Sequence, residues 1–219
     1  MYVRGVLSAD NTSSNYTRFK MSGKIAASGN CNALWNYQDL NAPLKTYCGC
    51  NMFNSCTALT TAPELPATTL AKYCYYFMFQ YCESLTTAPE LPATTLEMCC
   101  YYGMFYGCIS LTTAPELPAT TLAKYCYQSM FYGCRSLTTA PELPATTLAD
   151  SCYYYMFNGC ISLNHITCLA TDRSASSCTS SWLNGVSSTG TFVKHPDMNN
   201  WPTSKSGIPS GWTVIDAEL

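Results

Sequence analysis

Charged side chains are scarce in this chain of 219 residues: Asp, Glu, Lys and Arg make up 11% of it, against about a quarter in an average protein. The shortage does not predict disorder, because disordered chains combine many charges with few apolar groups, and 47% of the residues here are hydrophobic. Eleven basic and thirteen acidic residues leave a net charge of −2, so we expect neither nucleic acid nor an anionic membrane surface as a partner.

Long apolar runs are missing too. No stretch approaches the roughly 20 apolar residues of a transmembrane helix, so we expect no membrane span. The opening residues, Met1 to Ser14, lack the apolar core and the small-residue cleavage site of a signal peptide. We therefore expect either that the chain stays inside the cell or that Met1 opens a fragment whose export signal has been removed.

Motifs for catalysis are also absent. The sequence contains no Gly-x-Ser-x-Gly, no phosphate-binding loop and no His-Glu-x-x-His. Of the two histidines, His165 and His195, only the first has a cysteine nearby, Cys168, and nothing in the sequence supplies a third group to orient such a pair. We expect no enzymatic activity, no catalytic residue and no cofactor.

What the chain does contain is an internal repeat of 26 residues. The segment LTTAPELPATTL occurs four times without change, beginning at Leu59, Leu85, Leu111 and Leu137. Each copy is followed by two cysteines that flank a Met-Phe pair, and the second half of one further unit precedes Leu59. Apolar residues at fixed phases predict a solenoid, because one unit cannot bury its apolar side alone and stacked units share a core.

Within each unit the pattern predicts a short strand and a short helix. Pro63 and Pro66 favour an extended backbone, but they do not fit a long central strand. Apolar residues at 70, 74, 78, 79 and 82 lie mostly three or four apart, which indicates one or two helical turns. We therefore predict an α/β solenoid of about four full coils plus a partial one.

Three segments of the chain are expected. Residues 42–162 form the solenoid, residues 1–41 a hairpin-like N-terminal cap, and residues 163–219 a degenerate last repeat with a C-terminal cap. Caps are needed because a terminal unit would otherwise expose its apolar core. The last segment holds three tryptophans among proline and glycine turns, as a compact cap would: Trp182, Trp201 and Trp212.

The repeat resembles a known family. Its Met-Phe-x-x-Cys-x-Ser-Leu block, as at residues 78–85, is similar to the Ala-Phe-x-x-Cys-x-x-Leu block of BspA-like leucine-rich repeats, found in surface proteins of oral and gut anaerobes. Leu65-Pro66 stands in the place of that family's Ile-Pro, and the tail from Gly190 to Asp216 is similar to the segment that closes many such proteins. The resemblance spans roughly residues 42–214; the longer repeat and the methionine in place of alanine depart from the family pattern. It implies a leucine-rich-repeat fold and a role in surface attachment or protein binding.

Cysteine is abundant, with fifteen residues, ten of them at the two fixed cysteine phases of the repeat. In stacked units each phase forms a row inside the core, so we interpret these cysteines as small buried hydrophobic residues with free thiols. Their spacing forms no pair of Cys-x-x-Cys knuckles of the kind that binds zinc. We expect no bound metal, and a metal-binding cysteine row is a minor alternative.

Tyrosines mark one candidate binding face. They gather in the second half of the unit, where the copies differ, and tyrosine offers a large rigid contact area with a polar tip. The alternative is that the rings only cover the flank of the solenoid. The candidate residues are Tyr76, Tyr102, Tyr154, Tyr106, Tyr132, Lys72 and Lys124.

Glutamates mark the alternative face, on the extended half of the unit. Alternation along a strand turns the glutamate outward when the following leucine points inward, which predicts either a solvated acidic stripe or a face for a cation or basic partner. Adjacent threonines such as Thr60 and Thr61 should face opposite ways, which favours plain hydroxyl rows over the flat Thr-x-Thr rows of ice-binding proteins. The glutamates are Glu64, Glu90, Glu116 and Glu142.

The sequence thus predicts a non-enzymatic protein-binding or adhesion module of a bacterial cell-surface leucine-rich-repeat protein. The expected partner is a protein or glycan, for instance a component of a host extracellular matrix, and the expected location is extracellular or at the cell surface. The alternative is a structural spacer or receptor-binding component of a virion or envelope assembly, which the missing export signal favours.

Overall fold

The computed structural model describes residues 18–20, 23–34, 36, 38–40 and 42–219. All paired strands are parallel: β1 pairs with β2, and β3, β4 and β5 form a second sheet in that order. Most of the described chain is neither helix nor strand. The regular elements are β1 (Ile25–Ala26), the 3-10 helix η1 (Cys31–Leu34), β2 (Leu59–Thr61), β3 (His165–Cys168), β4 (Gly190–Lys194) and β5 (Trp212–Asp216).

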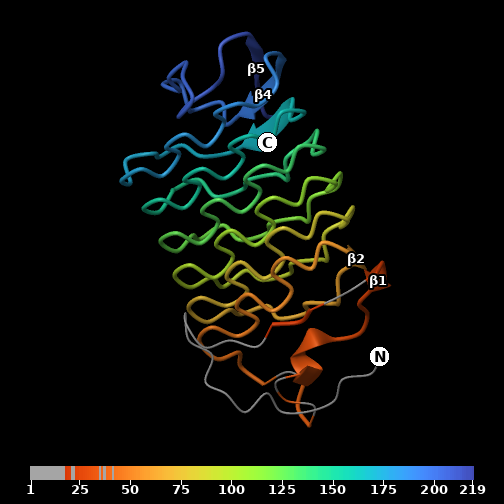
Figure 1. Ribbon diagram of the computed structural model, residues 1–219. Helices are drawn as coiled ribbons and strands as arrows, with labels where there is room; N and C mark the ends of the chain where they lie inside the picture. The colour runs from red at the N-terminus through yellow and green to blue at the C-terminus, as the bar shows by residue number, and fades with distance from the viewer. Residues whose placement is uncertain (1–17, 21–22, 35, 37, 41) are drawn as a thin grey trace.

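Consecutive 26-residue units lie side by side in chain order, from orange to blue in Figure 1. Parallel bridges join equivalent threonines of neighbouring units, Thr69 to Thr95 and Thr87 to Thr113. Equivalent rings also stack, with the centroids of Phe105 and Phe131 separated by 5.7 Å. Each of these residues therefore lies beside its counterpart 26 positions further along the chain.

The second half of each unit, for which we predicted a helix, is instead a run of turns. Backbone amides there alternate between two partners. The amide of Cys100 donates to the carbonyl of Glu97 in its own unit (3.2 Å), whereas that of Tyr101 donates to the carbonyl of Cys126 in the next unit (3.0 Å). The helix prediction was wrong because a spacing of four residues between Leu70, Cys74, Met78 and Cys82 also fits a run of turns. In these turns buried pairs, such as Cys74-Tyr75, are followed by pairs nearer the surface, such as Tyr76-Phe77.

The alternation of hydrogen-bond partners along this segment requires an unusual backbone. Fourteen non-glycine residues of the described chain have positive φ, among them Tyr73 (58°), Phe77 (49°) and Tyr81 (57°). The left-handed region costs a non-glycine residue about 1 kcal/mol or more, because its Cβ approaches the following carbonyl oxygen. Hydrogen bonds between units and the buried core must offset that cost.

The first half of the unit is extended, as predicted. In the first copy it forms β2, where Leu59 is fully buried, and Leu65 is buried shortly after β2 ends. The later copies make only isolated parallel bridges, such as Thr87 to Thr113. The two prolines of each copy explain this limit, because proline has no N–H to donate to a ladder.

The two ends of the described chain differ. Near the C-terminus Trp182 is fully buried and stacks on Tyr153 of the last full unit (6.1 Å) and on Trp201 (5.5 Å), which covers the end of the aromatic core. Near the N-terminus β1 pairs in parallel with β2, so the described part of the expected cap is not a hairpin. Residues 1–17 of the expected cap lie outside the described residues. None of the helices described is long and apolar enough to cross a membrane.

Glycines of one unit make room for aromatic rings of the unit before it. A Cβ on Gly107 would lie 2.5 Å from Cδ1 of Tyr81, and a Cβ on Gly103 would overlap the ring of Phe77. Gly133, at the same phase as Gly107, has only the Cα of Gly107 nearby, at 4.0 Å. Phe77 and Tyr81, as they are packed here, therefore leave no room for a side chain at Gly103 and Gly107.

Gly107→Ala should destabilise the protein more than Gly133→Ala. Both glycines have nearly the same positive φ, +71° and +70°, so both substitutions carry the left-handed penalty of about 1–2 kcal/mol. Only Gly107→Ala adds the overlap with Tyr81, which should cost about 1 kcal/mol more. Urea unfolding of the two variants measures the difference. Adding Tyr81→Ala to the Gly107→Ala variant should remove its extra destabilisation. Equal destabilisation by the two single glycine variants would contradict this packing.

Candidate binding faces

The turn half of each unit divides its tyrosines between the core and the surface. Tyr101 is 1% exposed, whereas its chain neighbour Tyr102 is only half-buried. The same division holds for Tyr75 and Tyr76. The boundary between a buried pair and a surface pair falls between these two tyrosines, so the two members of a Tyr-Tyr pair have different roles.

Surface aromatic residues form a continuous surface, which we call the tyrosine flank. Its members are half-buried apart from Tyr81, which is exposed: Tyr76, Phe77, Tyr81, Tyr102, Tyr106, Tyr132, Tyr154 and Tyr155. Tyr76 stacks on Tyr102 (centroids 4.9 Å apart) and Tyr106 on Tyr132 (4.5 Å). Phe77 connects the two stacks through edge contacts with Tyr102 (5.2 Å) and Tyr106 (6.3 Å). The structure thus brings four of the five predicted tyrosines together.

The fifth, Tyr154, makes its closest ring contact with Tyr155 (4.2 Å), which in turn meets the edge of Tyr132 (6.3 Å). Sequence reasoning missed Phe77, Tyr81 and Tyr155 as members of the flank. The signal for them was present, because the phases of Phe77 and Tyr81 hold glycine or serine in other copies and an aromatic residue there stands out.

Ring stacking decides what the tyrosine flank presents to a ligand. The faces of the stacked rings contact each other, so ring edges are left for solvent, and the Tyr106 hydroxyl forms hydrogen bonds with Tyr81 and Tyr132. Burial, then the neighbouring tyrosines, raises the pKa of Tyr76 to about 12 and that of Tyr106 to about 12. Their hydroxyls therefore stay protonated and can donate, and Tyr102 already accepts a hydrogen bond from the Gln128 amide (3.1 Å).

The two predicted lysines are not neighbours. Lys72 and Lys124 are two units apart, and Met98 holds the equivalent position between them. The ammonium group of Lys124 lies 3.6 Å from the Asp150 carboxylate and 5.0 Å from the centre of the Tyr125 ring. Lys72 lines an open depression of about 750 Å³ together with Glu97 and Asn32. The lysines therefore add no continuous basic stripe to the tyrosine flank.

The extended half forms a second surface, which we call the Thr–Glu face: the threonines and the glutamate of the four LTTAPELPATTL copies. In every copy the glutamate is exposed, and all four threonines are exposed apart from Thr60, which is half-buried. The expectation that adjacent threonines face opposite ways is wrong, because the segment is a strand only at Leu59–Thr61 and elsewhere departs from strict alternation. No ion pair among the described residues includes one of the four glutamates.

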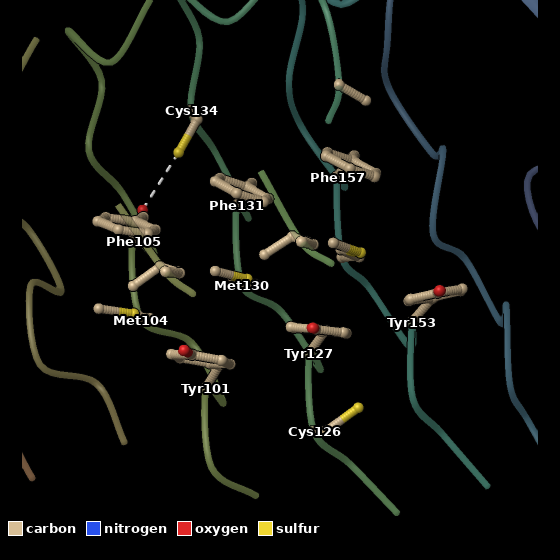
Figure 2. Packing of buried hydrophobic residues seen from close by; sticks show 14 of the residues in the cluster. Tyr101, Met104, Phe105, Cys126, Tyr127, Met130, Phe131, Cys134, Tyr153 and Phe157 are labelled. Atoms are coloured by element: carbon tan, nitrogen blue, oxygen red, sulfur yellow. Dashed lines mark hydrogen bonds between the residues drawn. The ribbon is translucent and has the colours of Figure 1, made fainter. Parts of the chain in front are cut away.

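The cysteines line the core, as predicted. All fifteen are buried and none forms a disulfide. One row donates its S–H to a phenylalanine carbonyl of the previous unit, for example from Cys108 to Phe79 (3.1 Å) and from Cys134 to Phe105 (3.1 Å), the latter drawn in Figure 2. Figure 2 also shows the phenylalanines, methionines and buried tyrosines of neighbouring units in parallel rows. Cysteine fits here because it is small and still satisfies a buried acceptor.

The cysteine thiols have low reactivity. Burial raises the pKa of Cys100, Cys108 and Cys168 to about 12 each, so the reactive thiolate form is disfavoured. Cys168 therefore lacks the character of a nucleophile beside His165. Among the described residues, no three His, Cys, Asp or Glu side chains are grouped so that they could hold a metal ion.

Comparison of the chain with protein families, with curated proteins and with solved structures gives no match.

Alkaline pH should unfold the protein at a lower denaturant concentration. In the folded state the pKa values of Cys100, Cys108 and Cys160 are raised to about 12, whereas in the unfolded chain the thiols ionise near pH 9. The unfolded state therefore binds fewer protons above pH 9, and the free energy of unfolding should fall by about 1.4 kcal/mol per pH unit for each such thiol.

Urea unfolding at pH 8.0, 9.5 and 10.5, followed by circular dichroism and by a thiol reagent, measures this effect. At pH 8 the native protein should leave its thiols unmodified, and unfolding should expose all fifteen. A stability that does not change with pH, or rapid modification of the native protein, would contradict thiol burial.

Proposed function

We propose that the chain is a leucine-rich-repeat solenoid that acts as a non-enzymatic binding module of a bacterial cell-surface protein, like the BspA-like proteins that its repeat resembles. Support for the solenoid comes from the hydrogen bonds that join each unit to the next and from the rows of identical buried residues. Neighbouring units supply most of the burial of any one unit, which is the physical basis of repeat proteins.

The tyrosine flank is the observation that supports binding best. It is a continuous row of half-buried rings with hydroxyl groups at its outer edge, and tyrosine of this kind contributes area and hydrogen bonds at a low cost in conformational entropy. Its residues differ from copy to copy: the phase of Phe77 holds Gly103, Ser129 and Tyr155 in the next three units. A surface that changes along its length suits an irregular partner, so the proposed ligand of the tyrosine flank is a folded protein.

Free thiols are compatible with an extracellular site. Cysteines outside the cell usually form disulfides, but oxidation starts from an accessible thiolate. Here the thiols are buried and burial raises their pKa values, for example to about 12 for Cys152. The interior therefore protects the thiols in an oxidising environment.

Tyrosine hydroxyls on the flank should contribute to binding. A panel of host matrix proteins and whole bacterial cells should identify a protein ligand for the wild-type chain. The triple variant Tyr102→Phe, Tyr106→Phe and Tyr132→Phe keeps the ring stacks and removes only hydroxyls, each worth about 0.5–1.5 kcal/mol in a direct hydrogen bond. We expect the dissociation constant, measured by surface plasmon resonance, to rise at least about tenfold.

The matched control is Tyr101→Phe with Tyr127→Phe, because these two rings belong to the same units but are buried. The control should bind like the wild type. Equal affinity of the triple variant would argue against the tyrosine flank, and failure to bind any member of the panel would favour the alternative role as a structural spacer of a virion or envelope assembly.

Deleting a whole unit tests the repeat architecture. Removal of residues 111–136 places Gly107 beside Gly159 and should leave a shorter, cooperatively folded protein. Removal of residues 85–110 instead places Phe77 beside Ser129 rather than Gly103, so this deletion should be the less stable one by about 1–3 kcal/mol. Circular dichroism and urea unfolding measure the folding and the stability of the two deletion variants. Complete unfolding of the first deletion variant would contradict stacking by nearest neighbours.

A further inference from the structure

We propose that the open depression near the N-terminal end of the stack binds a short extended peptide, which adds a strand beside residues 66–71. The depression has a volume of about 750 Å³, and no member of the tyrosine flank lines it. The inference goes beyond the protein partner proposed for that flank. It rests on the cavity itself, on a buried acceptor that lacks a donor and on the unpaired edge of an extended segment.

The depression lies between two parts of the chain that follow one another in the stack. One wall is residues 66–72 of the first full unit, and the facing wall comes from described residues of the segment 40–46. Asn32, from η1 at the lower end of the molecule in Figure 1, completes the lining. Leucine, proline and alanine side chains dominate both walls, with a few polar groups among them, as is typical of ligand sites.

The buried acceptor belongs to Asn32, which is only 6% exposed. Its amide nitrogen donates to the Leu40 carbonyl (2.8 Å), whereas its Oδ1 is buried and accepts no hydrogen bond from any described residue. Buried polar atoms are nearly always paired, so an unpaired one in the wall of a cavity indicates a donor from outside the chain. Leu40 is 39% exposed, and a small shift of this residue can admit that donor to Oδ1.

The unpaired edge belongs to Thr69. The amide of Thr95 donates to the Thr68 carbonyl (3.3 Å), and the amide of Leu70 donates to the Thr95 carbonyl (3.0 Å). In a parallel pair of strands the residue between two such bonds turns its own N–H and C=O to the opposite side. Those of Thr69 therefore point away from the next unit and towards the depression, and neither has a partner among the described residues.

The repeat itself shows what fits such an edge. At the bridge between Thr69 and Thr95, one copy of the sequence PATTL pairs in parallel with the next copy. One unit earlier, the phase of Thr69 holds Pro43, which has no N–H to donate. No bridge joins these two residues in the part of the chain that the structure describes. An added peptide with the sequence of the repeat can take the place of the missing partner, as in other proteins that bind peptides along a strand edge.

The spread of polar groups along the depression favours a peptide over a compact small molecule. Asn32 lies near one end, because the amide of its neighbour Cys31 donates to the Glu64 carbonyl (3.0 Å). Thr69 follows further along the wall, and Lys72 ends it. An extended segment of this length spans about 20 Å. A peptide offers an N–H and a C=O at each residue over that distance, whereas a compact molecule reaches only one of these groups.

Isothermal titration calorimetry tests the proposal with the hexapeptide PATTLA, the sequence of residues 66–71, acetylated and amidated at its ends. We expect saturable binding of one peptide per chain. In the register of the bridge between Thr69 and Thr95, the leucine N–H of the peptide donates to the Thr69 carbonyl. N-methylation of that leucine should weaken binding by about fivefold or more, because it removes this hydrogen bond. N-methylation of the final alanine, whose N–H turns away from Thr69, should leave the affinity unchanged.

Asn32→Ala should weaken binding of the hexapeptide by about fivefold or more, because it removes the acceptor. The matched control is Asn158→Ala. Asn158 is also buried and also donates to a carbonyl, that of Ser181 (3.3 Å), but it does not line the depression. The control should bind the hexapeptide like the wild type. The triple Tyr→Phe variant should do so too, so a failure of the tyrosine flank and a failure of this site are distinguishable.

The N-methylated peptides leave the protein unchanged, so they test the site even if circular dichroism shows that Asn32→Ala does not fold. The proposal is overturned if the hexapeptide shows no saturable binding, if the two N-methylated peptides bind alike, or if the two folded asparagine variants have the same affinity. N-acetyl-leucinamide binding as tightly as the hexapeptide would also overturn it, in favour of a small apolar ligand.

Discussion

Hydrogen bonds from alternate backbone amides to the next unit are the constraint on which the rest of the structure depends. Along the turn half, one amide binds within its unit and the next reaches a carbonyl 25 residues further on, as with Tyr101 and Cys126. This pattern fixes the register between units and requires positive φ at regular intervals. Along this segment pairs of buried residues are followed by pairs nearer the surface, as with Cys74-Tyr75 and Tyr76-Phe77, so the same backbone determines both the core and the tyrosine flank.

The core follows from that register. Equivalent residues meet each other from unit to unit, which gives stacks such as Phe131 on Phe157 (5.5 Å) and Tyr101 on Tyr127 (5.8 Å). Each side chain must therefore suit its own counterpart. Cysteine does so because its small thiol fits between units and donates to a carbonyl, and burial keeps it protonated. Gly103 does so because a Cβ at this position would overlap the ring of Phe77 in the unit before it.

The repeat forms two surfaces, of which one varies among the copies and the other is constant. The tyrosine flank varies among units and its rings are packed edge outward, whereas the Thr–Glu face is constant and, apart from Thr60, exposed. The variation along the tyrosine flank supports the proposed binding of an irregular protein partner.

The sequence by itself determined the repeat, its phase, the buried cysteines and the outward glutamates, because exact periodicity and residue chemistry suffice for those. It did not determine the backbone of the turn half: spacings of four residues fit a helix and a run of turns equally well, and only contacts with the neighbouring unit distinguish them. The exposure of adjacent threonines and the contact of Phe77 with Gly103 were likewise decided by tertiary structure. Both depend on which residue of the adjacent unit, 26 positions away in the sequence, lies alongside in space. Local propensity carries no information about that neighbour.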